Sequence, residues 1–195
     1  QLVQIVRFAH WDGLKPAPLT KRYALTWRYQ ENAPKNTMLQ DSLKSAYFWD
    51  SYSVKTKYDN QTALDIYLAI AKNTPSWVIQ LMTLRNWFVS KLGLKNLGKI
   101  NEFEHRNSSE DYKAGDTIGI FKLVANSRNE VVLEDRDKHL DVRISLLVEP
   151  DGEQAIVHAT TVVHVNNLLG KIYMFFVAPV HKVIVPSSLK TITQA

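Results

Sequence analysis

Histidine is the residue type in this chain best suited to metal binding or acid–base chemistry. Four of the six histidines fall in the regularly patterned part of the sequence, namely His139, His158, His164 and His181. His158 and His164 stand six residues apart, about 20 Å along an extended strand, so one ion cannot bind both. The absence of cysteine excludes thiolate ligands, disulfides and a thiol nucleophile. We expect no metal site and no cofactor.

Two polar groups of residues are candidates for ligand recognition. His139 lies in the run Asp137–Asp141, which opens a predicted strand. This run is either a surface ion-pair cluster or a polar group that orients a ligand at a cavity mouth. Tyr173 follows Asn166 and Asn167 at the junction of the last strand and the final helix. No Gly-x-Ser-x-Gly elbow accompanies them, so no catalytic set can be assigned.

Arg85 is a cation on an otherwise apolar predicted helix. A guanidinium near a core needs a partner, because an unpaired buried charge is costly. We expect Arg85 to pair with Glu130 or Asp141, or to meet the acid group of a ligand.

Composition indicates one globular domain. The chain has 195 residues, of which 45% are hydrophobic and 22% charged, which is near the globular average. The formal charge of +5 is interspersed with acidic residues rather than gathered in a stripe, so nucleic acid is not an expected partner. The first ten residues lack the pattern of a secretory signal, and we expect a cytoplasmic protein.

Residues 1–45 differ from the rest, because they hold Pro16, Pro18 and Pro34 and show no sustained period. We expect them to form an irregular arm that is not an independent domain. The arm is expected to pack on the body or to mediate a homodimer. Residues 46–195 are then a single domain.

The first half of that domain predicts a strand and two helices. Residues 47–57 alternate as a strand does, and Thr62 with Asp65 resembles the capping box of a helix that ends near Asn73. Thr74 and Pro75 then begin a second helix, which Gly93 ends. One side of this second helix carries an apolar stripe, which predicts that this side faces the core: Trp77, Leu81, Leu84, Phe88 and Leu92.

The second half predicts an antiparallel sheet and a closing helix. Period-two segments at 118–124, 130–134, 140–148 and 155–165 are separated by turn residues, including the Asp151-Gly152 pair. Residues 168–193 then show helical spacing, with Pro179 and Pro186 as kinks. Charged residues interrupt this helix, so we expect it to pack on the sheet rather than to span a membrane, with Phe176 in the core.

Several blocks carry a family resemblance: 75–78, 81–86, 115–121, 137–141, and 164–167 with Gly170 and Tyr173, extended by Pro179, His181 and Val185. They resemble the uncharacterised family called domain of unknown function 2867. The element order is also similar to the helix-grip fold of START and birch-pollen-allergen-like proteins. The resemblance implies an α+β fold, an antiparallel sheet wrapped around a long C-terminal helix, and a cavity between them, without an established activity.

Three functions remain open. The first is a binding module for a small apolar or amphipathic ligand in that cavity, and a cavity of roughly 300 Å³ or more would imply this function. A close-packed interior would instead favour an accessory domain. The second is an enzyme of the cyclase, dehydratase or hydrolase type in the same cavity, and the third is an accessory or protein-interaction domain. The predicted ligand-binding residues are Trp77, Leu81, Arg85, Phe121, Glu130, His139, Leu140, Val142, Tyr173 and Val177.

Overall fold

The structure is a computed structural model of the chain, and it describes residues 27–30, 32–91 and 108–193. A seven-stranded antiparallel sheet stands at its centre, in the order β1-β2-β7-β6-β5-β4-β3. The strands are β1 (Trp27–Tyr29), β2 (Phe48–Lys57), β3 (Thr117–Ile118), β4 (Phe121–Asn126), β5 (Glu130–Arg136), β6 (Leu140–Asp151) and β7 (Gln154–Val165). The predicted α+β class and the antiparallel order are confirmed.

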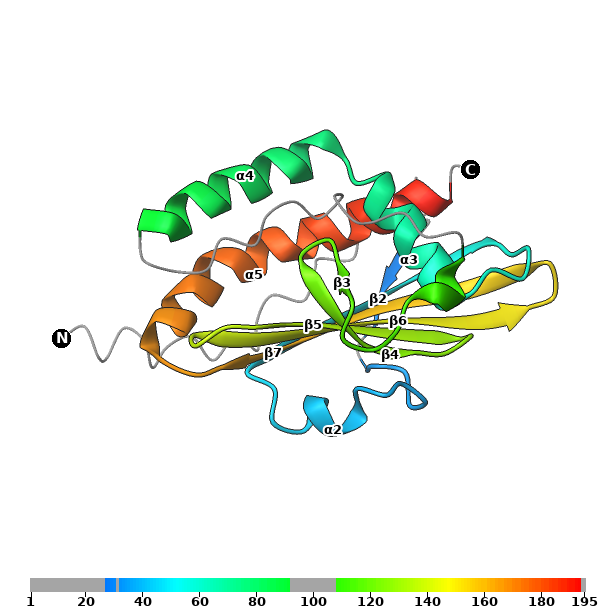
Figure 1. The fold of residues 1–195 in the computed structure, drawn as a ribbon, viewed down its shortest axis with the longest axis horizontal. Helices are drawn as coiled ribbons and strands as arrows, with labels where there is room; N and C mark the ends of the chain where they lie inside the picture. The colour runs from blue at the N-terminus through cyan, green and yellow to red at the C-terminus, as the bar shows by residue number, and fades with distance from the viewer. Residues whose placement is uncertain (1–26, 31, 92–107, 194–195) are drawn as a thin grey trace, which may run out of the picture.

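Helices cover both faces of this sheet (Figure 1). They are α2 (Gln40–Leu43), α3 (Ala63–Lys72), α4 (Ser76–Lys91) and α5 (Leu168–Leu189), with short 3-10 turns η2 (Ser109–Asp111) and η3 (Lys190–Ile192). α3 and α5 lie on one face, which we call the inner face, and α4 lies beyond α5 (Figure 1). α2 lies on the opposite, outer face (Figure 1).

Local signals set the ends of several elements as predicted. Thr62 caps α3 by accepting a hydrogen bond from Asp65 N, while the Asp65 side chain accepts from Thr62 N. Asn73 ends the helix. Gly152, with a φ of +65°, makes the turn between β6 and β7, which glycine adopts without strain. The predicted end of α4 at Gly93 lies outside the described residues.

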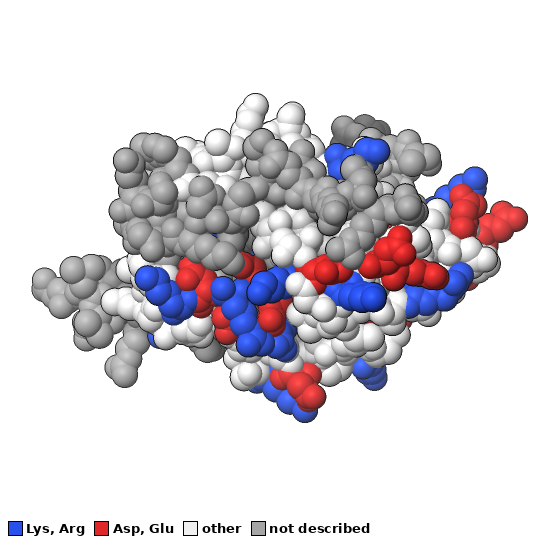
Figure 2. Space-filling view, viewed as in Figure 1, with Lys and Arg blue, Asp and Glu red and all other residues white. Residues whose placement is uncertain are grey.

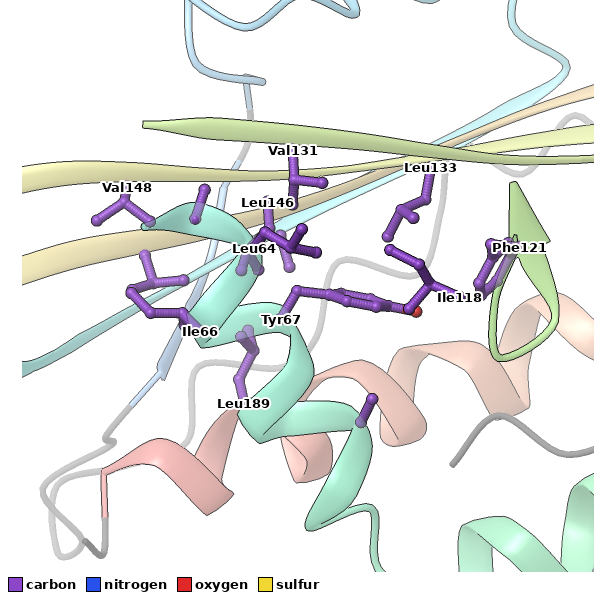
Figure 3. Packing of buried hydrophobic residues seen from close by; sticks show 14 of the residues in the cluster. Leu64, Ile66, Tyr67, Ile118, Phe121, Val131, Leu133, Leu146, Val148 and Leu189 are labelled. Carbon is purple, nitrogen blue, oxygen red and sulfur yellow. The ribbon is translucent and has the colours of Figure 1, made fainter. Parts of the chain in front are cut away.

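The largest apolar cluster lies between α3 and the inner face (Figure 3). Leu64 and Tyr67 of α3 pack there against Leu133, Leu146 and other side chains of β5 and β6. Leu64 and Leu133 are fully buried. This end of the molecule is therefore a filled core.

α5 packs on the inner face through part of its circumference. Gly170, Met174 and Leu189 are buried, and Met174 joins a second cluster with Leu140 and Val163. Phe176, which we expected in the core, is 66% exposed. That expectation is wrong, because α5 is apolar around most of its surface and helical spacing then does not select the buried face.

α4 buries a different side from the one its stripe predicts. Val78 is 2% exposed, whereas Trp77 is 37% and Leu84 is 53% exposed. The expected core face of α4 is therefore wrong at those two positions. α4 packs outside α5 rather than on the sheet, so it has no sheet surface to bury against (Figure 1).

The described part of the N-terminal region is built onto the sheet. β1 pairs with β2, and the stretch through α2 crosses the outer face (Figure 1). There Leu39 packs with Val132 and Val162 in a third apolar cluster. Residues 1–26 of the predicted arm lie outside the described residues.

Candidate functional site

A buried carboxylate lies under α5. Asp50 of β2 is 1% exposed, and its Oδ2 lies 2.9 Å from Nδ1 of His181 on α5. Thr161 of β7 stands opposite Asp50 in the ladder and is 4% exposed, and Tyr52 follows on the same face. We call Asp50, Tyr52, Thr161 and His181 the inner polar cluster.

The Asp50–His181 contact fixes which nitrogen of the imidazole faces the carboxylate. A carboxylate accepts hydrogen bonds, so Nδ1 donates to Asp50 and Nε2 is the nitrogen turned away from it. The ring of Phe48 meets His181 edge-on, with centroids 6.1 Å apart and planes at 89°. His181 is thus held from two sides, which is the arrangement that orients a general base.

Two buried side-chain oxygen atoms on the inner side of the sheet have no hydrogen-bond partner among the described residues: Asp50 Oδ1 and the Tyr67 hydroxyl. Leaving such a group unsatisfied typically costs about 1–3 kcal/mol. Burial raises the pKa of Tyr67. Burial, together with the charge of Asp50, also raises the pKa of Tyr52. Both phenols are therefore neutral hydrogen-bond donors across the physiological range.

A small hollow opens at the first turn of α5. It is lined by Arg85, Asp135, Asp137, His139, Leu140, Leu169 and Tyr173. Four of the predicted ligand-binding residues, Arg85, His139, Leu140 and Tyr173, thus come together. The hollow measures about 20 Å³, room for about one water molecule. This is far below the roughly 300 Å³ that would imply a ligand function.

Arg85 is held by α5 within this hollow. Its Nε donates to the Tyr173 hydroxyl at 3.0 Å, and its Nη1 donates to Asn86 Oδ1 at 2.9 Å. Among the described residues, neither Glu130 nor Asp141 contacts Arg85, since both side chains lie on the outer face. The predicted pairing with either acid is therefore wrong.

His139 belongs to a turn that is clamped to the start of α5. Asn167 caps α5 by accepting from Gly170 N at 3.1 Å, and its Nδ2 donates to Lys138 O at 3.0 Å and lies 2.9 Å from His139 Nδ1. Asn166 Nδ2 donates to Asp137 O at 3.2 Å. These polar residues therefore fix the β5–β6 turn against the helix.

The other predicted site residues are dispersed. Val142 joins the cluster around Leu140 and Met174, Val177 of α5 is half-buried, and Phe121 lies in the filled core beside Ile118. Leu81 and Trp77 lie on α4 outside α5. None of these five residues lines the hollow.

Glu130 lies on the outer face and is 3% exposed. Its carboxylate accepts hydrogen bonds from Thr37 Oγ1, Ser145 Oγ and, at 3.0 Å, Met38 N. This buried acid therefore fastens the segment before α2 to the sheet.

An open outer groove of about 320 Å³ lies next to α2. Its lining combines Asp41, Ser42, Ser45, Arg136, Asp141, Arg143 and His164. Ser45 Oγ lies 3.3 Å from His164 Nε2, but no described carboxylate bonds to His164 Nδ1 to orient it. Arg143 is held by Glu134 at 2.8 Å, so the groove has little unbalanced charge. Among the described residues, no group of three His, Cys, Asp or Glu side chains is placed to hold a metal ion.

The inner polar cluster was not predicted as a site. Asp50 is the one acid on the inner face of β2, where alternation also places Phe48, Tyr52, Val54 and Thr56. An acid in this otherwise uncharged row was the sequence signal that could have identified the site. His181 follows Val177 by four residues on α5 and so shares its face. Their pairing needed the three-dimensional arrangement.

An open antiparallel sheet with a long C-terminal helix on one face defines the class of this domain. Within that class, the chain belongs to a family of proteins of unknown function, DUF2867, whose model matches residues 42–188. The predicted family is thereby confirmed. No curated protein matches the sequence.

Proposed function

We propose that this domain binds a small amphipathic molecule between the inner face and α5, as helix-grip proteins of the START type do. The supporting observation is Asp50, a 1% exposed carboxylate that His181 and the Tyr52 hydroxyl approach and whose Oδ1 has no further hydrogen-bond partner among the described residues. A ligand hydroxyl or amine would satisfy this oxygen. Phe48 and Val163 form the next inward-facing pair along β2 and β7 from Asp50, and they belong to one apolar cluster with Val142, so the rest of the ligand is apolar.

Ligand entry would need α5 to move outward, because the hollow at its first turn measures only about 20 Å³. Pro179 lies inside α5 and removes one hydrogen bond from the helix, which lowers the cost of bending there. Leu140, Val142, Tyr173 and Val177 would line the apolar body of the ligand. Arg85 and His139 would stand at the mouth.

Native mass spectrometry of the full chain purified from its own host, followed by titration with fatty acids, sterols and aromatic alcohols, tests this proposal. Replacing the acceptor in Asp50→Leu should weaken binding of a hydroxyl-bearing ligand about tenfold, equivalent to one hydrogen bond. Val142→Trp should also weaken binding, because the larger side chain would take the place of the ligand's apolar body. Ser51→Ala is the matched control, because Ser51 is next to Asp50 but lies on the outer face of the sheet. This variant should bind as the wild type does.

Binding that Asp50→Leu and Val142→Trp leave unchanged would place the ligand elsewhere. A chain that retains no molecule from its host and binds no compound of the panel would contradict the proposal and favour an accessory-domain function.

A second candidate function is acid–base catalysis by His181. The 2.9 Å contact between Asp50 Oδ2 and His181 Nδ1 favours it, since a carboxylate so placed orients Nε2 toward a substrate proton. For any compound that binds, mass spectrometry after long incubation would reveal chemical change. His181→Gln should stop that change while binding persists, and a compound recovered unaltered from the wild type rules out turnover.

A further inference from the structure

Among the described residues, nothing covers a broad apolar face of α5. Its exposed large side chains are Leu168, Ile172, Phe175, Phe176, Val180 and Val183. Apart from the adjacent pair Phe175 and Phe176, they recur every three or four residues and so form one stripe, about 22 Å long at 1.5 Å per residue. Phe175 and Phe176, at 61% and 66% exposed, stand in the middle, in edge-to-face contact.

The helices that carry this face have no acidic residue. α4 (Ser76–Lys91) and α5 (Leu168–Leu189) contain Arg85, Lys91, Lys171, His181 and Lys182 but neither Asp nor Glu. Lys171 is exposed beside Ile172, and Lys190 follows the end of α5. The sheet differs, because acidic and basic side chains are interleaved over it (Figure 2).

From these two features we infer that the exposed apolar stripe of α5 docks on an anionic lipid surface. An apolar stripe flanked by lysines is the pattern of a helix that lies in the membrane interface, with its side chains among the headgroups. A second copy of the chain fits less well, because a symmetric contact would bring the lysines of two acid-free helices together. This inference is independent of the proposed ligand site.

In this inference, α5 lies on the lipid surface rather than crossing the bilayer. The segment Leu168–Ile192 is long and apolar enough to span a membrane, with a mean hydropathy of 1.6 in its most apolar window and only 11% of that window buried. Yet α5 is tied to the sheet at both His181 and Gly170, whose Cα lies against the His139 carbonyl. The attached sheet holds the helix axis along its own plane, so α5 can meet lipid only through its exposed apolar stripe.

Co-sedimentation of the full chain with vesicles tests the inference. We expect binding to vesicles enriched in phosphatidylglycerol, weaker binding to phosphatidylcholine alone, and loss of the difference at high salt. Phe175→Ser with Phe176→Ser should lower the partition coefficient at least about tenfold, because two large apolar side chains are removed from lipid. Lys171→Glu should weaken binding to the anionic vesicles more than to the neutral ones.

Met38→Ser with Val124→Ser is the matched control, since both side chains are exposed and lie away from α5. This variant should sediment as the wild type does. Thermal unfolding of the phenylalanine variant should match the wild type, because neither ring is in the core. A chain that ignores both vesicle types, or binds them equally, overturns the inference. A dimer that the phenylalanine variant dissociates, without vesicle binding, would assign the stripe to a second copy and overturn it too.

Discussion

Gly170 is where α5 comes closest to the turn before β6. A Cβ at this position would stand 2.3 Å from the His139 carbonyl oxygen and 2.9 Å from Val165 Cγ1. Asn167 in the same turn of helix caps α5 and holds the Lys138 carbonyl. The polar block around His139 is therefore held by backbone contacts, which explains its composition without a catalytic role.

Gly170→Ala should destabilise the protein by about 1–3 kcal/mol, because the backbone oxygen of His139 has to move. Alanine is favoured over glycine within a helix by about 1 kcal/mol, but that gain does not relieve a 2.3 Å contact. Urea unfolding measures the change. Lys171→Ala, at the exposed neighbouring position, should fall within about 0.5 kcal/mol of the wild type. An unchanged Gly170→Ala would mean that the turn is not clamped.

At the scale of the element, α3 shows a local signal and a tertiary contact acting together. Thr62 and Asp65 form the capping box, and Thr62 Oγ1 also lies 3.0 Å from Ser109 Oγ in η2. Burial on its own would raise the pKa of Asp65, but the hydrogen bonds from Thr62 and Ser109 outweigh it and hold the pKa below its ordinary value. The carboxylate form of Asp65 therefore stabilises the folded state.

Thr62→Ala should cost about 1 kcal/mol at neutral pH, as the loss of a helix cap does. Because the pKa of Asp65 is lowered on folding, its contribution is complete above the unfolded value of 3.8. It is lost as the pH falls through the lower folded pKa. The stability difference between Thr62→Ala and the wild type, measured by urea unfolding, should therefore shrink in acid. Thr83→Ala, an exposed threonine within α4, should show no such pH dependence.

At the scale of the whole molecule, Glu130 joins two segments far apart in the chain. Its carboxylate accepts from Thr37 and Met38 ahead of α2 and from Ser145 of β6, all on the outer face. Leu39 continues this contact into the apolar cluster with Val132 and Val162. The outer face of the sheet is thus covered by this N-terminal segment, whereas the inner face is covered by α3 and α5.

Glu130→Ala should destabilise the fold by about 3 kcal/mol, because three hydrogen bonds to a buried charged group are lost. Hydrogen exchange of the Met38 amide should accelerate more than that of the β6–β7 hairpin, since the segment before α2 is released first. Glu149→Ala, at a more exposed acid of the same sheet, is the control. Equal acceleration at all amides would show global unfolding instead of release of this segment.

The sequence by itself determined what depends on neighbouring residues. The box at Thr62, the Asp151-Gly152 hairpin and the period-two strands are local signals, and the structure contains each of them. The antiparallel order of β3 to β7 followed, because each of these strands is joined to the next by a short turn. The pairing of β2 with β7 did not follow, because the two strands lie far apart along the chain. The hollow residues Arg85, His139, Leu140 and Tyr173 were also selected from the sequence, as members of blocks that resemble the family.

Only the tertiary structure decided which faces meet. Asp50 and His181 are 131 residues apart, so their contact depends on how α5 is placed on β2, which no local spacing records. Glu130 was expected beside the ligand, but strand alternation allows either face, and the Thr37 contact placed it outside. α5 is apolar on nearly all sides, so its sequence has no contrast that predicts a buried side. The clamp at Gly170 and the bond to Asp50 set its rotation, which turns His181 toward the sheet and leaves Phe176 exposed.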